Sequence, residues 1–154
     1  MFFNDRARVG GIVLTLASDL DMPVIIHDRE AHKDSLDIVS CHKDVTGVFH
    51  CFSGSREMSR EVLNLGYFIA FGGSLTFKNN VKTVEVAKYV PLDMIVVETD
   101  APYLTPVPFR GKRNSSQYIA YVIEKLAEIK GISVEDVENA TFENAKRLFR
   151  MDGV

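Results

Sequence analysis

The chain has 154 residues, of which 46% are hydrophobic and 25% are charged. This composition is typical of a single globular domain and excludes a disordered or fibrous protein. The formal net charge of −3 gives no overall attraction to polyanions, so a nucleic-acid contact would need a local basic patch. The two cysteines, Cys41 and Cys51, are too few for a secreted disulfide scaffold, and no apolar run reaches the ~20 residues that span a bilayer. We therefore expect one cytoplasmic domain over residues 1–154.

The first twenty residues carry a weak helical pattern. Ile12, Leu16 and Leu20 recur at a spacing of four, which is typical of one face of a helix. Gly10 and Gly11 stand where a longer helix would continue, and glycine lowers helix propensity. We expect a short, imperfect helix that ends before Pro23, because proline disfavours the α conformation in the residue that precedes it.

Four short runs rich in β-branched and aromatic residues follow along the chain. They are residues 23–27 (PVIIH), 47–52 (GVFHCF), 67–73 (YFIAFGG) and 94–100 (MIVVETD). The runs are almost continuously apolar, which is typical of strands that are covered on both faces. We expect a parallel sheet with helices outside it.

Segments with helical spacing lie between and after these runs. Residues 31–39, a segment around Met58 and Val62 that Gly66 ends, and residues 80–90 each predict a helix. After a loop over residues 101–114, residues 115–130 predict an amphipathic helix that Gly131 ends. Ser133 and Thr141 predict the N-caps of two closing helices. The alternation of strand and helix predicts an α/β fold with four parallel strands and outer helices.

Three of the four runs end in a residue that can bind a metal, namely His27, His50 and Asp100. The carboxyl ends of parallel strands meet at one face of the sheet, so ligands that are distant in sequence can converge there. Imidazole and carboxylate together suit Zn²⁺ or Mn²⁺, and also Mg²⁺ if water completes the shell. Glu98 lies two residues before Asp100 and is expected to point the same way, in support of the ligands. A hydrogen-bonded structural histidine is the competing interpretation for each position.

A second set of residues beyond the strand ends suggests an anionic partner. Serine at the start of a helix offers backbone N–H donors to a phosphate, and arginine can bind phosphate oxygens through two nitrogens. The residues are Arg29, Ser53, Arg110, Lys112 and Arg113. A solvated basic loop and a simple N-capping turn are the alternatives.

The motifs around these residues resemble those of the TatD deoxyribonucleases. The segments are residues 23–32 (PVIIHDREAH), 47–54 (GVFHCFSG), 98–104 (ETDAPYL), 108–114 (PFRGKRN) and 141–149 (TFENAKRLF). The resemblance implies that the chain forms strands 5 to 8 of a distorted TIM (β/α)₈ barrel of the metallo-dependent hydrolase superfamily. It also implies hydrolysis of DNA, as single strands or at ends, with two divalent metal ions (Mg, Mn or Zn) in the intact family site. It implies that His27 and His50 bind metal, and that Asp100 binds metal and orients or deprotonates the attacking water. It also implies that Arg29, Ser53 and the loop from Arg110 to Arg113 lie near the substrate's phosphates.

The chain also departs from this family. Residues 1–15 match it poorly, and the His-x-His pair of strand 1 and the bridging glutamate of strand 4 have no counterpart here. At most one ion is therefore expected, and one copy cannot close a barrel. Two alternatives to a DNase stay open. One is hydrolysis of another small ester or amide, and the other is a non-catalytic half-barrel that forms a homodimer through bare edges at its first and last strands.

Overall fold

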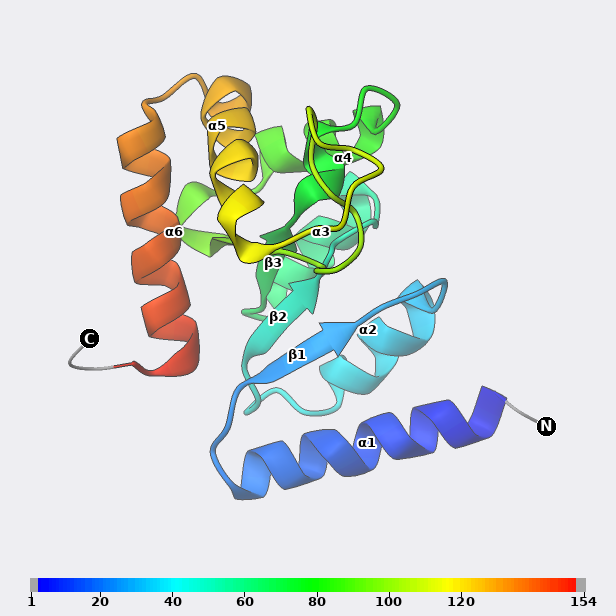
Figure 1. The fold of residues 1–154 in the computed structure, drawn as a ribbon. Helices are drawn as coiled ribbons and strands as arrows, with labels where there is room; N and C mark the ends of the chain where they lie inside the picture. Colours follow the sequence, from blue (N-terminus) through cyan, green and yellow to red (C-terminus); the bar gives the residue numbers. More distant parts are fainter. Residues whose placement is uncertain (1–2, 152–154) are drawn as a thin grey trace.

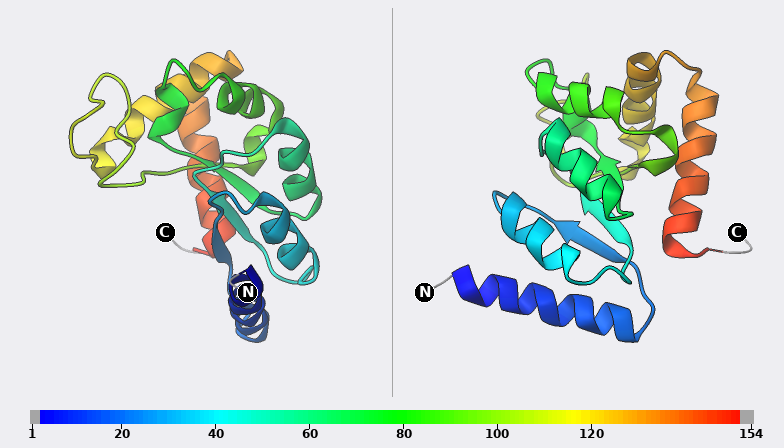
Figure 2. Two further views of the ribbon diagram at one scale, coloured as in Figure 1. Left: turned by 90° about the vertical axis from the view of Figure 1, so that its right-hand side faces the viewer. Right: turned by 180° about the vertical axis from the view of Figure 1, so that it is seen from behind.

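The computed structural model describes the backbone of residues 3–151 and the side chains of residues 9–151. Four parallel strands form one sheet in the order β1-β2-β3-β4, with helices between them (Figures 1 and 2). The strands are β1 (Val24–His27), β2 (Gly47–His50), β3 (Phe68–Phe71) and β4 (Ile95–Val97). The α-helices are α1 (Phe3–Asp19), α2 (His32–Ser40), α3 (Arg56–Asn64), α4 (Val81–Tyr89), α5 (Ile119–Lys130) and α6 (Val134–Phe149). Short 3₁₀ helices are η1 (Gly73–Thr76), η2 (Leu92–Met94) and η3 (Ser116–Tyr118). The predicted α/β fold is confirmed.

The two faces of the sheet carry separate hydrophobic clusters. One face presents Phe49, Ile69, Phe71 and Ile95 to the large core, to which helices α2 to α5 contribute. The opposite face presents Val48, Phe68, Ala70 and Val96, which Leu148 of α6 covers. Each set is one row of alternate residues across paired strands, as the parallel register requires.

Helix α6 lies along the outer edge of β4 and covers it. Its Val137 belongs to the large core, whereas its Leu148 packs on the opposite face. Between them, Asn144 donates from Nδ2 to the carbonyl oxygens of Leu92 and Ile95, at 2.8 and 2.7 Å. The prediction of two bare sheet edges is therefore wrong for β4, because α6 packs along this strand and Asn144 donates to its Ile95 carbonyl.

Several predicted helix ends are confirmed. Gly66, which follows the C-cap of α3, and Gly131, the C-cap of α5, take left-handed φ angles of 79° and 69°, a conformation that glycine adopts without a Cβ clash. The Ser133 side chain accepts a hydrogen bond from the amide of Asp136 at the start of α6. These caps fix the ends of the helices that follow β2 and β4.

The predicted length of the first helix and the N-cap predicted at Thr141 are wrong. Helix α1 is longer than expected because it continues through both glycines, and Gly10 faces Ile38 of α2, where a Cβ would make an ordinary contact at 3.4 Å. Helix α6 continues through Thr141, which is no N-cap, because its hydroxyl donates to the carbonyl of Val137 within the helix. No described helix is both long and apolar enough to cross a bilayer.

Candidate functional site

The C-terminal ends of the strands bring the predicted histidines together. His27 and His50 are direct partners in the β1–β2 register, and Ile25 and Val48, two residues earlier on each strand, are partners as well. The two imidazole rings stack with their centroids 5.5 Å apart and their planes at 28°. Because the two histidines are partners on neighbouring strands, their rings lie side by side at the same end of the sheet.

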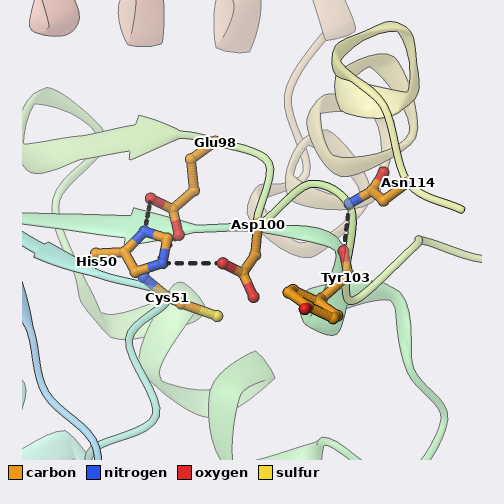
Figure 3. Close-up of polar contacts among 6 residues, drawn as sticks. All are labelled: His50, Cys51, Glu98, Asp100, Tyr103 and Asn114. Atoms are coloured by element: carbon orange, nitrogen blue, oxygen red, sulfur yellow. Dashed lines mark hydrogen bonds and ion pairs between the residues drawn. The ribbon is translucent and has the colours of Figure 1, made fainter.

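His50 lies between two carboxylates (Figure 3). Its Nδ1 is 2.6 Å from Oε2 of Glu98, and its Nε2 is 3.4 Å from Oδ1 of Asp100. The side chains of His50 and Glu98 are 16% and 18% exposed, whereas Asp100 is 33% exposed. The site therefore has a shielded imidazole–carboxylate pair and one carboxylate that solvent can reach.

Glu98 is held by a second donor. The backbone amide of Cys51 donates to Oε1 at 2.6 Å, and Cys51 itself has a left-handed φ of 47°. A non-glycine residue in this conformation is strained, and such strain gathers at functional sites. Burial raises the pKa of Glu98, although the hydrogen bond and charge of His50 act against this shift. Burial, followed by the charges of Glu98 and Asp100, raises the pKa of the Cys51 thiol to about 11.

The last strand is shorter than predicted. Strand β4 ends at Val97, and the amide of Glu98 makes one more bond to the carbonyl of Phe71 before the chain leaves the sheet. Glu98 and Asp100 therefore start a loop instead of closing a strand. The difference arises because β3 ends at Phe71, the partner of Val97, so the residues after Val97 have no neighbouring strand to pair with.

The loop over residues 101–114 is anchored beside the site by close backbone contacts. Asn114 is buried and donates from Nδ2 to the carbonyl of Tyr103 at 2.6 Å (Figure 3). A Cβ on Gly73 would lie 2.0 Å from the carbonyl oxygen of Leu104, so only glycine lets the loop come this close. Tyr103 is exposed next to Asp100. The sequence predicted this loop but not these anchors, since they depend on tertiary contacts.

The predicted phosphate-binding residues are spread over several elements. The Arg110 guanidinium lies 4.0 Å from the centroid of the Phe77 ring, and Lys112 lies 5.5 Å from that of Phe109. Arg113 and Ser53 are exposed, and Arg29 lines a groove beside β1. The aromatic supports Phe77 and Phe109 were missed from the sequence, where no pattern links them to the basic residues. A shared phosphate site stays a prediction.

The donor set around His50 fits a divalent cation. Metal-bound histidines commonly donate their other ring N–H to a carboxylate, and Nδ1 of His50 lies 2.6 Å from Oε2 of Glu98, where such a bond can form. Two ligands bound at about 2.1 Å in tetrahedral geometry stand about 3.4 Å apart, which matches the separation of His50 Nε2 and Asp100 Oδ1. Among residues 3–151, however, no three His, Cys, Asp or Glu side chains are grouped as a metal ion would require. One ion held by His27, His50 and Asp100 together stays a prediction.

The chain is similar to known proteins in both sequence and fold. The chain is 45% identical over 141 residues to an uncharacterised metal-dependent hydrolase, YabD, of Bacillus subtilis, covering 90% of this chain and 55% of that protein. It is 43% identical to the uncharacterised metal-dependent hydrolase YcfH of Escherichia coli, covering 90% and 53%. The crystal structure of YJJV, a TatD homologue from Escherichia coli, matches with a TM-score of 0.83 and 32% identity over 89% of this chain and 53% of that chain.

The chain spans about half the length of the curated relatives it matches. Its four strands and outer helices correspond to about half of the YJJV crystal structure. The family model of the TatD related DNases matches residues 12–150, which is nearly the whole chain. The chain therefore belongs to the TatD related DNase family.

Proposed function

We propose that this chain contributes part of the active site of a metal-dependent hydrolase that cleaves phosphodiester bonds of DNA. The surroundings of His50 carry the proposal. When Glu98 is ionised it can only accept, so Nδ1 holds the ring proton and the Nε2 lone pair faces Asp100 Oδ1 at 3.4 Å. Two acceptors at this separation favour a positive charge between them. The names of the relatives YabD and YcfH point to a metal ion.

Each residue of the site has a distinct part in this proposal. Glu98 fixes the tautomer and orientation of His50, so that Nε2 keeps a lone pair that can bind a metal ion. Asp100 is the exposed carboxylate, and it is placed to orient a water molecule and accept its proton. The chemistry that a bound divalent cation supplies is polarisation of a phosphoryl oxygen and a lower pKa for bound water. Arg110, Lys112 and Arg113 supply positive charge on the neighbouring loop.

Titration calorimetry with Mn²⁺ or Zn²⁺ tests the metal site. Asp100→Ala should abolish binding, and Glu98→Gln should weaken it by about 10- to 100-fold, which is the usual effect of losing the partner of a ligating histidine. Asp93→Ala is the matched control, because Asp93 is an exposed carboxylate at the other end of β4. Equal binding by all four proteins would contradict the assignment, and would leave a protonated Nε2 as the charge between His50 and Asp100.

Cleavage of single-stranded DNA in Mg²⁺ or Mn²⁺ tests the reaction. Activity that Asp100→Ala removes and Asp93→Ala keeps would support a DNase. Equal activity in the wild type and Asp100→Ala would contradict the role of Asp100. Thermal protection separates DNA from smaller substrates, since the ligand that binds the folded state more tightly raises the melting temperature more. Stronger protection by a small phosphoester than by an oligonucleotide would favour the alternative substrate class.

A further inference from the structure

The two outer edges of the sheet differ in what covers them. Backbone groups of successive residues point to opposite edges of a strand. The amide of Glu98 bonds to β3. The backbone N–H and C=O groups of Ile95, an odd number of residues away, therefore point to the outer edge of β4, where Asn144 donates to the Ile95 carbonyl. The amide of Val24 bonds to Thr46 on the β2 side, so the groups of Ile25 point to the outer edge of β1. Among the hydrogen bonds of residues 3–151, none covers the edge at Ile25.

An apolar surface continues from this open edge onto α1. The Ile25 side chain is 60% exposed. A groove of about 680 Å³ runs from Ile25 along β1 to Val9 and Val13 of α1. Figures 1 and 2 show α1 at the margin of the molecule, with no other described element on its far side. The exposed apolar residues of this surface are Val9, Ile12, Val13, Leu16, Leu20, Met22 and Ile25.

The pattern on α1 shows that this surface has the form of an interface. At 100° per residue, the exposed apolar residues from Val9 to Leu20 fall within about 100° of arc, whereas Leu14 and Ala17 lie on the neighbouring arc and are buried. A helix that packs on one side only would carry polar residues on its outer side. The outer side of α1 therefore has the apolar character of a second buried face.

We propose that two copies of the chain associate through β1 and α1 about a twofold axis. Antiparallel pairing of the two open β1 edges would continue the sheet, and the apolar face of each α1 would pack against its own copy. A head-to-tail chain of β1 on β4 is disfavoured, because α6 occupies the β4 edge. A contact between identical surfaces closes on itself as a dimer.

The area of the surface is close to what a specific dimer needs. Large apolar side chains that are more than half exposed present on the order of 80 to 100 Å² each, so the seven together offer roughly 600 to 700 Å², against about 800 Å² per partner in a standard interface. The backbone of the β1 edge adds to this area. The dimer does not depend on the proposed hydrolase activity, and either can fail without the other.

Sedimentation velocity of the purified chain over a wide range of concentration tests the dimer. The expected result is a species of twice the 17.3 kDa chain mass at high concentration. Leu16→Asp should raise the dimer dissociation constant at least about 30-fold, the effect of losing an interface hot spot, because each copy would bury a new charge in the interface. Val81→Asp is the matched control, because Val81 lies on α4, outside the apolar surface of α1 and β1, and its 62% exposure is close to the 55% of Leu16.

A second variant tests the strand edge itself. Ile25→Pro removes an N–H group that points to the outer edge, a position where a strand tolerates proline, and it should also weaken the dimer. Circular dichroism of each variant establishes that the monomer remains folded. A monomer at every concentration would overturn the proposal, whatever other polypeptide the surface binds. A dimer that Val81→Asp disrupts and Leu16→Asp does not would overturn it equally.

Discussion

Gly73 offers the sharpest test of how the site loop is held. Its Cβ position lies 2.0 Å from the carbonyl oxygen of Leu104 and 3.0 Å from the nitrogen of Pro106. Both neighbours are backbone atoms, so Gly73→Ala must push the loop back by about 1 Å or more to reach a normal contact distance. Overpacking of this kind costs about 1–3 kcal/mol, and we expect the upper half of that range because no side chain can rotate away.

The measurement is thermal unfolding followed by circular dichroism. For a chain of this size, each kcal/mol lowers the melting temperature by about 2–4 °C, so Gly73→Ala should lose about 5–10 °C. Gly72→Ala is the matched control, because its Cβ would meet its nearest neighbour, the carbonyl oxygen of Glu98, at an ordinary 3.5 Å. Gly72 also has an extended φ of −116°, which any residue adopts. Equal melting temperatures for the two variants would refute the close approach of the loop.

Three further outcomes follow from buried polar groups. Asn144→Ala should lower the unfolding free energy in urea by about 2–3 kcal/mol, because two carbonyls lose their donor, whereas Ala at the exposed Asn64 should change it by less than about 0.5 kcal/mol. Because burial raises the pKa of Cys51 to about 11, iodoacetamide at mildly alkaline pH should alkylate the exposed Cys41 first, and equal rates would contradict this. Burial also raises the pKa of Glu98 above its ordinary value of 4.5. The neutral carboxyl group therefore contributes its full stabilisation below pH 4.5, and this contribution is lost as the pH rises through the raised pKa. Glu98→Gln should flatten this fall in the unfolding free energy, measured in urea between acidic and neutral pH, and an unchanged pH profile would exclude Glu98 as its source.

The order of elements could be predicted from the sequence because its signals are local. Continuous apolar runs marked all four strands, and glycines marked the ends of α3 and α5. The contact between His50 and Asp100 also follows from a local rule, since both residues come at or just after the C-terminal ends of parallel strands. Strand lengths were overestimated, because apolar residues continue into the loops that pack over the sheet.

Other features depend on partners that are distant in sequence. The cover on β4 comes from Asn144, which lies 49 residues beyond Ile95. Helix α1 passes through Gly10 despite the low helix propensity of glycine, and its Leu14 and Ala17 pack into the large core. Thr141 has the side chain of an N-cap, yet it bonds back to Val137 inside α6. A single sequence does not display these contacts.

Helix α1 is held to the rest of the molecule by few buried side chains, and this affects the dynamics of the molecule. From Val9 onward, only Leu14 and Ala17 of this helix are buried. Local opening costs less where few apolar contacts are lost, so α1 can detach and refold while the sheet stays intact. Its amide hydrogens should then exchange with solvent far sooner than those of Phe49 and Ile69, at the centre of the fold.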